Sequence, residues 1–412
     1  MRIKKIQNNF INILILFLIP SFYSWLYYLF RFYKNPKKNL FYYSFISASI
    51  LILMIPMFDI VYTFDSFLFI KDLSIKEFMK YKLPLYHYFY YFGGKFFSFW
   101  NIYFIVIFLL IYIYNKAYVR SIKNNGSNEI IFLIFIFSLW YRNILDITRY
   151  TLACIVYIYC VLNYLNNKKG KYLIILSVFF HNSFIIFVAL FYISIVIKKL
   201  KMNLNKFFIF CIFILIILKI IENKLLIIIE KCSKYLSLNF YKRLNNYVLN
   251  KNNVLEILKN SEVETIKFLI ILSTLIIFGI IFFNICKKNR NKKFIEILVM
   301  ELYFFTLFFL NSYVLNERLF ILIYLLMIIY FINKYKYIDK KYIKILCINV
   351  FMNYIFFTGC YLNTFYFHGD VPHLKNTISS KYEILKIFYQ PNILTVINNK
   401  YTNEWLIKWR KR

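Results

Sequence analysis

Long apolar runs without a charged residue recur along the whole chain and alternate with polar connectors. The clearest runs are Phe10–Phe30, Leu40–Phe58, Phe96–Asn115, Tyr150–Leu165, Phe268–Cys286 and Leu319–Ile332. Most of them approach the roughly 20 residues that an α-helix needs to cross a bilayer, and they do not alternate polar with apolar residues as barrel strands do. Because a helix satisfies its backbone hydrogen bonds within one segment, the pattern predicts an all-α, polytopic membrane bundle of about 11 to 12 transmembrane segments.

The polar connectors differ in charge, and the difference predicts the topology. Six short connectors are rich in Lys and Arg and contain one acid, Asp339: they are 31–39, 116–128, 166–171, 198–206, 287–293 and 333–344. The positive-inside rule places these connectors in the cytoplasm. Three longer segments, 59–98, 222–267 and the C-terminal 361–412, hold most of the acidic residues, and we expect them outside. Alternating the sides from span to span then places the N-terminus outside.

One apolar segment, Tyr172–Ile197, has basic residues at both ends. It is either one long span or two short helices that meet at His181–Ser183 and return to the cytoplasm. The broken pair keeps every basic connector inside, so we predict that arrangement. Its two half-length helices are tolerable in a membrane only where they pack within protein.

The composition excludes several classes of protein. The chain is 61% hydrophobic and 23% aromatic, which a water-soluble domain with a polar surface does not need. The net charge of +34 would suggest nucleic acid as a partner of a soluble protein, but the basic residues lie between spans, so no nucleic acid is expected. No two cysteines form a C-x-x-C pair, and neither a metal nor another cofactor is predicted. We interpret residues 1–412 as a single integral membrane domain.

Several ionisable residues outside the connectors fall at the predicted outer level. They are Arg142, Asp146 and Arg149 between two spans, His181 at the tip of the broken pair, and Glu317 and Arg318 at the start of a late span. A charge at membrane depth is costly and indicates a function. Arg142, Asp146 and Arg149 would share one helical face, and two arginines around one carboxylate could hold an anion such as a diphosphate. The alternative is a junction whose arginines reach out to water.

Other candidate residues have two interpretations each. His181 is either a packing residue or a catalytic base. The outer loop contains Asp65 and the aromatic stretch Tyr86–Phe92, which is either an interfacial belt or a platform for sugar rings. Arg243, in the second outer loop, either binds an anionic substrate or belongs to a solvated charge cluster.

The order of these features resembles the EpsG family of bacterial exopolysaccharide and O-antigen polymerases, which are Wzy-type enzymes. The family has Arg-x-x-x-Ala at the head of one helix and Phe-His-x-Ser near the end of the next. Arg149, Ala153, His181 and Ser183 match these motifs, with a basic turn between the two helices. Weaker similarities are Asp65 followed by Pro84-Leu85-Tyr86, and Arg318 at the start of a late span.

The resemblance implies a glycosyltransferase-C-like polymerase at the outer face of the bacterial cytoplasmic (inner) membrane. Such an enzyme joins oligosaccharide repeat units, carried on undecaprenyl diphosphate, into O-antigen, capsule or exopolysaccharide. Its expected partners are the lipid-linked oligosaccharide, membrane lipid and a chain-length regulator, and it is expected to need no metal. A flippase for the same lipid-linked unit and an O-antigen ligase-like glycosyltransferase are the alternatives. A flippase should line a central cavity at mid-depth with its charges, whereas these charges collect at one face.

The resemblance also implies roles for the candidate residues. The catalytic residues would be Arg149, His181 and Asp65, with His181 as the base and Asp65 or Asp146 as the other candidates for that role. The lipid diphosphate would be bound by Arg142, Arg318 and Arg243, and Asp146 and Glu317 would support these cations.

Overall fold

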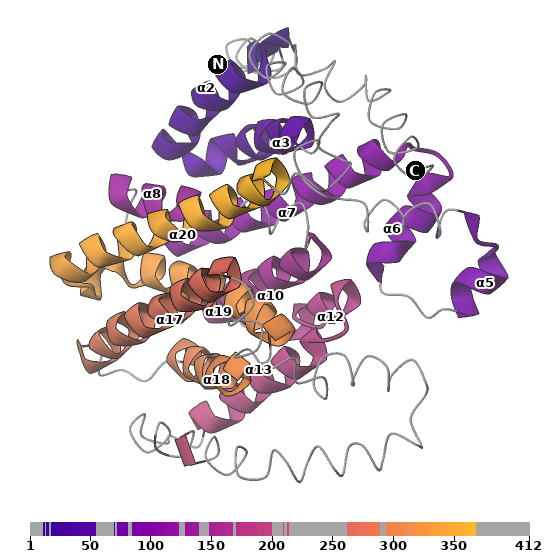
Figure 1. The fold of residues 1–412 in the computed structure, drawn as a ribbon. Coiled ribbons are helices and arrows are strands. Elements are labelled where there is room, and N and C mark those ends of the chain that lie inside the picture. The colour runs from indigo at the N-terminus through magenta and orange to yellow at the C-terminus, as the bar shows by residue number, and fades with distance from the viewer. Residues whose placement is uncertain are drawn as a thin grey trace. The chain divides into compact units, whose positions relative to one another are not determined.

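The computed structural model describes most of the predicted apolar segments. The described residues are 11–12, 14–15, 18–54, 70, 72–80, 85–122, 128–139, 148–167, 170–199, 209, 212–213, 262–288, 294–311 and 313–367. Every regular element among them is a helix (Figure 1). The predicted all-α class is therefore confirmed for this part of the chain.

The chain divides into two compact units. Unit 1 comprises residues 1–162, 176–182 and 350–412, and unit 2 comprises residues 163–175 and 183–349. Two long helices, α10 (Thr148–Asn167) and α20 (Lys340–Phe367), each contribute residues to both units.

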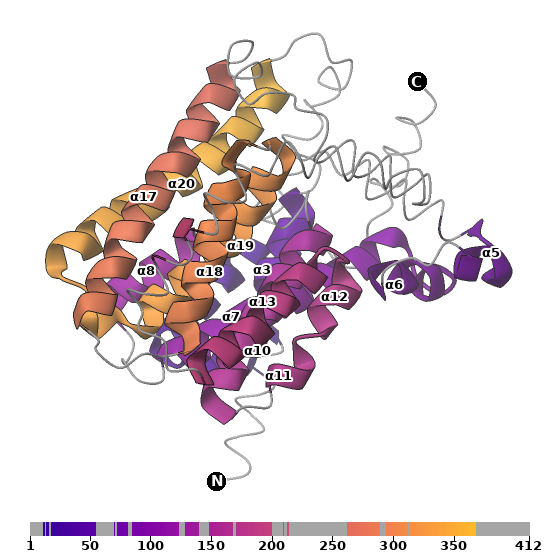
Figure 2. The same cartoon turned by 90° about the horizontal axis from the view of Figure 1, so that it is seen from below.

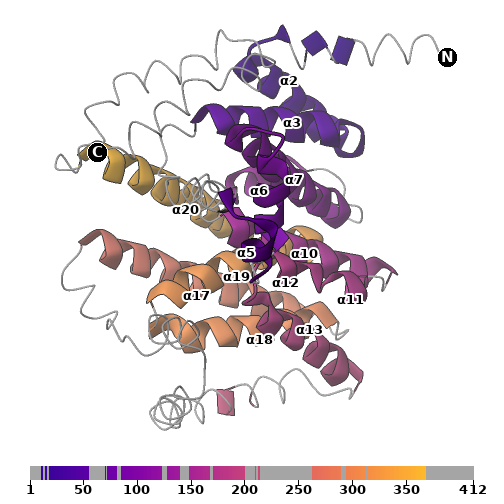
Figure 3. The ribbon, with the colours of Figure 1, turned by 90° about the vertical axis from the view of Figure 1, so that its right-hand side faces the viewer.

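The helices of unit 1 pack through aromatic side chains. Besides its parts of α10 and α20, the unit contains α2 (Ser21–Lys34), α3 (Pro36–Met54), α5 (Ile75–Lys80), α6 (Leu85–Gly94), α7 (Phe99–Ser121), α8 (Glu129–Phe137) and α12 (Leu176–Phe180). α3 packs between α2 and α7 (Figure 3). Tyr118 of α7 stacks on Phe135 of α8, with ring centroids 4.1 Å apart. Because aromatic rings fill the spaces between these helices, much of the unusual aromatic content is explained by packing.

A single helix, α19 (Tyr313–Asn333), lies at the centre of unit 2. The other helices of the unit are α11 (Gly170–Leu173), α13 (Phe184–Lys199), α17 (Glu262–Lys288), α18 (Phe294–Phe308), and the 3-10 turns η4 (Phe309–Asn311) and η5 (Tyr335–Tyr337). Every residue of α19 from 319 to 332 is buried, as expected for a helix that is apolar on all sides. α17 and α18 pack against it (Figure 2).

The described helices extend into connectors that were predicted to be loops. α7 continues to Ser121, so Lys116 and Arg120 lie in its last turns, whereas the sequence interpretation assigned them to the connector 116–128. Lys and Arg are good helix formers, and their long side chains reach the surface from within a helix. A charged residue at the end of an apolar run therefore marks the edge of the apolar environment and not the end of the helix.

Two helices in the described residues are long and apolar enough to cross a membrane: Asn101–Ser121 and Thr265–Lys288. The sequence interpretation predicted about 11 to 12 segments. Several of the predicted spans appear as shorter or more polar helices. α8 has 9 residues, and α10 carries 4 tyrosines and 3 asparagines among its 20 residues. By length and composition, the described part of the chain thus contains two candidate membrane spans.

The predicted break at His181 is confirmed. α12 ends at Phe180, and α13 begins at Phe184 after a turn. The Tyr192 hydroxyl on the second arm donates a hydrogen bond to the carbonyl of Lys171 at the start of the first arm. Both residues belong to unit 2, so this contact ties the start of the segment to its second arm. The arms are about 16 and 24 Å long, shorter than the roughly 30 Å of a hydrocarbon core.

Protein packing within unit 2 holds α13, the second arm, in place. Phe187 of α13 lies edge-on to Phe305 of α18, with ring centroids 6.1 Å apart. The Ser194 hydroxyl donates to the carboxyl group of Glu301, also on α18, at 2.6 Å. Both polar groups are buried, so the hydrogen bond fixes α13 against α18 in a setting where an unmatched polar group is costly.

A glycine allows α17 and α18 to approach closely. A Cβ added to Gly279 would lie 2.6 Å from the hydroxyl oxygen of Tyr303. That hydroxyl donates to the carbonyl of Leu275 at 3.0 Å. We expect Gly279→Ala to displace the hydroxyl and to destabilise the protein by about 1 kcal/mol, the usual contribution of one hydrogen bond. Thermal unfolding of the purified protein measures the loss.

The control for this prediction is Tyr303→Phe, which removes the hydroxyl that the new methyl group would displace. In the Tyr303→Phe background the added alanine should cost less than it does in the wild type. Equal costs in both backgrounds would show that the Tyr303 hydroxyl is not what Gly279 accommodates.

Candidate functional site

Arg149 is the second residue of α10, and α7 holds the start of that helix. The hydroxyl groups of Tyr103 on α7 and Thr148 on α10 are hydrogen-bonded at 3.1 Å, and both residues are buried. The first backbone N–H groups of a helix point out of its N-terminus and carry a partial positive charge. Arg149 therefore adds a full positive charge to an end of α10 that already favours anions.

The guanidinium of Arg149 faces a buried histidine on another helix. Nη1 of Arg149 lies 3.4 Å from Nε2 of His87, and His87 is 8% exposed. Because a guanidinium group only donates hydrogen bonds, Nε2 of His87 is the acceptor in this contact, and a neutral ring then carries its proton on Nδ1. α6, which carries His87, thus helps to set the direction of the Arg149 side chain.

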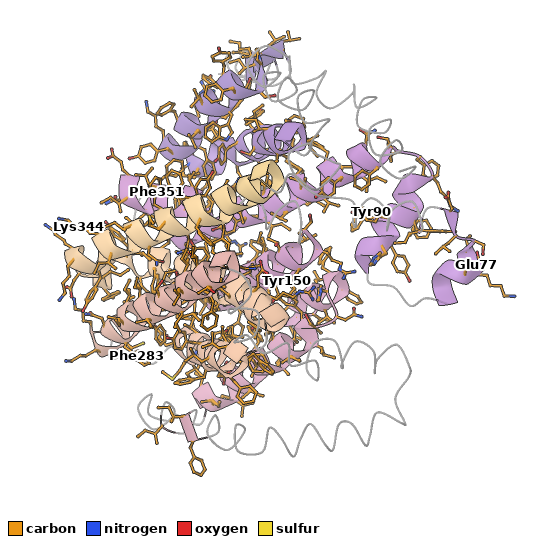
Figure 4. All side chains as sticks on the ribbon, in the orientation of Figure 1. Glu77, Tyr90, Tyr150, Phe283, Lys344 and Phe351 are labelled. Atoms are coloured by element: carbon orange, nitrogen blue, oxygen red, sulfur yellow. The ribbon has the colours of Figure 1, made fainter. Side chains whose placement is uncertain are left out.

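His181 lies against Tyr150, the residue that follows Arg149. The two rings are nearly perpendicular, and their centroids lie 5.2 Å apart. Tyr150, labelled in Figure 4, is buried, whereas His181 is half-exposed. α12, which ends one residue before His181, packs against α6. We call His87, Thr148, Arg149, Tyr150 and His181 the Arg149 cluster.

The two residues singled out at the start of α19 belong to unit 2. Glu317 forms an ion pair with Lys267 of α17, with 3.1 Å between Nζ and Oε2, and both side chains are largely buried. The carboxylate that was predicted to support a substrate-binding arginine thus also ties the starts of α17 and α19 together. Arg318 is half-buried and follows Glu317 directly.

Four of the predicted site residues lie outside the described residues: Asp65, Arg142, Asp146 and Arg243. Their roles stay predictions. Among the residues that the structure describes, no three of His, Cys, Asp or Glu gather in a way that could hold a metal ion.

The aromatic stretch before α7 contains both buried and exposed rings. In α6, Tyr90 and Tyr91 are 0% exposed, and Tyr90 lies 6.2 Å, ring to ring, from Phe99 of α7 (Figure 4). Phe89 and Phe92 are exposed on the same helix. The α-helical period explains the difference, because neighbouring residues of a helix point in different directions. Tyr90 and Tyr91 are packing residues, and only the exposed rings could contact a sugar.

His87 was not among the residues predicted from the sequence. It lies inside that aromatic stretch, for which the sequence pattern indicates an interfacial belt or a sugar platform. One feature of the sequence could have identified His87: it is a histidine in an apolar segment, at the membrane level predicted for Arg149. Its partner could not be identified, because the contact joins residues that are 62 positions apart in the chain.

Comparison with known proteins adds one finding. The family model described as EpsG family matches residues 65–378, about three quarters of the 412 residues, and this region contains the whole Arg149 cluster. No curated protein and no solved structure matches the chain.

Proposed function

Because the chain belongs to the EpsG family, a family of Wzy-type, exopolysaccharide polymerase-like membrane proteins, we propose that it polymerises lipid-linked oligosaccharides. Its substrate is an oligosaccharide repeat unit on undecaprenyl diphosphate, and its product is an O-antigen, a capsule or an exopolysaccharide. The reaction takes place at the outer face of the bacterial cytoplasmic membrane. One observation carries the proposal: Arg149 and His181, which match the family's two motifs, lie within one cluster of side chains.

The chemistry of the reaction requires a cation beside the leaving group. A hydroxyl group of one repeat unit attacks the anomeric carbon of the other, and the glycosidic C–O bond to the lipid diphosphate breaks. Negative charge then develops on the departing diphosphate. A guanidinium held in place before the reaction stabilises that charge most in the transition state, and its fork can bind two phosphate oxygens. Arg149 has this role in the proposal, and no metal is needed.

The remaining groups complete the mechanism. The attacking hydroxyl gives up its proton, and His181 is the base, because its half-exposed ring can contact a substrate and a neutral imidazole nitrogen can accept a proton. Asp65 and Asp146 are the other candidates for the base. Arg142, Arg318 and Arg243 bind the diphosphate in this proposal, and a chain-length regulator is a further partner.

The function is tested by the length of the surface polysaccharide in the source organism. The gene is deleted and then restored, and the polysaccharide is separated on a gel. Loss of long chains, with single repeat units still present, supports the polymerase. Lipid-linked units that accumulate on the inner leaflet would identify a flippase instead. Long polymer left on its lipid carrier would identify a ligase.

The His87 contact predicts a smaller effect on the same reaction. His87→Ala removes the acceptor that directs the Arg149 guanidinium, and we expect polymerisation to slow about tenfold, which corresponds to about 1.4 kcal/mol. His87→Gln should retain part of the activity, because its side-chain carbonyl can accept the same hydrogen bond. The rate of polymer formation in membranes is the measurement.

Ile105→Leu, at an exposed position of α7 outside the Arg149 cluster, is the control and should polymerise at the wild-type rate. If His87→Ala also polymerises at the wild-type rate, His87 does not position Arg149. If His87→Gln and His87→Ala polymerise at the same reduced rate, the role of this ring is packing and not the hydrogen bond.

A further inference from the structure

Two cations on α7 lie over one aromatic ring of α10. The Nζ atom of Lys116 is 5.4 Å from the centroid of the Tyr159 ring, and the guanidinium carbon of Arg120 is 4.6 Å from it. The two residues are four positions apart, so they lie one above the other on the same face of α7. Lys116 and Arg120 are called the α7 cation pair below.

The charges of the α7 cation pair are not neutralised within the described residues. Neither residue forms an ion pair there, and the Nη1 atom of Arg120 is buried without a hydrogen bond to those residues. Two like charges at this spacing repel each other. The aromatic face attracts both cations but supplies no full negative charge. In the sequence, the connectors that follow α7 and α10, residues 123–128 and 168–171, contain further lysines and no acid. Among the residues that the structure describes, no carboxylate therefore balances these two charges.

The α7 cation pair lies toward the opposite end of these helices from the Arg149 cluster. Tyr103 meets Thr148 at the start of α10, and Arg120 meets Tyr159 further along, so α7 and α10 run in the same direction. The rise of a helix separates Thr148 from Tyr159 by about 16 Å along the axis of α10. The cation pair is thus distinct from the proposed catalytic site.

The surroundings of the cation pair indicate the kind of anion. Asn101–Ser121 is one of the two described segments that are apolar enough to span a membrane, and the cation pair occupies its last turns. The end of a span lies at the level of the lipid headgroups. Anionic lipids attract basic residues at the cytoplasmic surface, where the charge pattern predicts this end of α7.

We propose that Lys116, Arg120 and Tyr159 bind the phosphate group of an anionic phospholipid. The guanidinium of Arg120 offers a fork of N–H donors that fits two phosphate oxygens, and Lys116 adds a second positive charge. The ring of Tyr159 holds both cations in place from the protein side. This lipid is a bound partner of the protein and takes no part in polymerisation.

Lipid retention by the purified, full-length protein tests the proposal. The protein in detergent is titrated with phosphatidylglycerol, and the retained lipid is measured by native mass spectrometry. Lys116→Gln together with Arg120→Gln should reduce retention at least tenfold. Lys198→Gln together with Lys199→Gln, at the exposed end of α13, makes the same change in net charge and should retain the lipid as the wild type does. Equal retention by all three proteins overturns the proposal.

Phosphatidylcholine, inorganic phosphate and one further variant identify the ligand and the role of the guanidinium. Phosphatidylcholine has no net charge and should bind weakly to every variant. If inorganic phosphate alone stabilises the wild type against heat as well as phosphatidylglycerol does, the site takes a soluble phosphate compound and the lipid assignment is wrong. Arg120→Lys keeps the charge and the helix but loses the fork, so it should retain less lipid. Wild-type retention by Arg120→Lys would overturn the role given to the guanidinium.

Discussion

Replacing Arg149 with alanine is expected to abolish long-chain polysaccharide while the protein remains in the membrane. The substitution removes the cation that lies at the start of α10 beside His87. In the proposed mechanism this cation stabilises the charge of the departing diphosphate. Loss of one such preorganised donor typically slows a reaction by on the order of 10² to 10³, enough to eliminate long chains. The length distribution of the polysaccharide, read on a gel, is the measurement.

The matched variants separate charge from geometry. Arg149→Lys keeps the positive charge but loses the planar fork, so its chains should be shorter than those of the wild type and longer than those of Arg149→Ala. Lys34→Ala removes a cation from the end of α2 and should leave chain length unchanged. Wild-type chains from Arg149→Ala, at equal amounts of protein, would remove this residue from the site.

The largest loss of stability is expected from Lys334→Met in unit 2. Nζ of Lys334 lies 3.2 Å from Oε1 of Glu296, and the two side chains are 6% and 2% exposed. The hydroxyl of Tyr330 donates to the same carboxylate oxygen at 3.4 Å. Removing the ammonium leaves a buried carboxylate without its counter-ion, which typically costs about 3 to 5 kcal/mol. The temperature at which the purified protein loses its helical circular dichroism signal should fall clearly.

A double variant and a surface variant make this prediction specific. Adding Glu296→Gln to Lys334→Met removes the unpaired charge and should restore most of the lost stability. Lys288→Met breaks the exposed pair between Lys288 and Asp339 and should have little effect, because water screens that pair. If Lys334→Met and Lys288→Met unfold at the same temperature, burial does not make the Glu296 pair important.

The sequence by itself determined the helical class, the interruption between α12 and α13, and the family. Apolar runs of about 20 residues leave the backbone few alternatives to a helix, whatever the rest of the chain does. The break at His181–Ser183 followed from local evidence, since both flanks of one apolar segment are basic. The motifs around Arg149 and His181 indicated the EpsG family, and the match over residues 65–378 confirmed it. All of these features depend on residues that are close together in the chain.

The ends of the helices were predicted less well for a related reason. Lys116 and Arg120 marked the end of an apolar run, but the helix continued through them. Hydrophobicity reports which environment surrounds a residue, whereas a helix ends where its backbone hydrogen bonds end. The two coincide only when a cap or a proline stands at the boundary, as Pro36 does at the start of α3.

Only the tertiary structure decided which side chains meet. It brought His87 to Arg149 and placed His181 against Tyr150, and it paired Glu317 with Lys267. It also placed the rings of Tyr90 and Tyr91 in the core, although the sequence of the aromatic stretch does not indicate which rings are buried. The physical reason is that an apolar helix with similar residues on all sides has no preferred face in its sequence. Its rotation is set by the helices that pack around it, and so are the partners of every polar group that it carries.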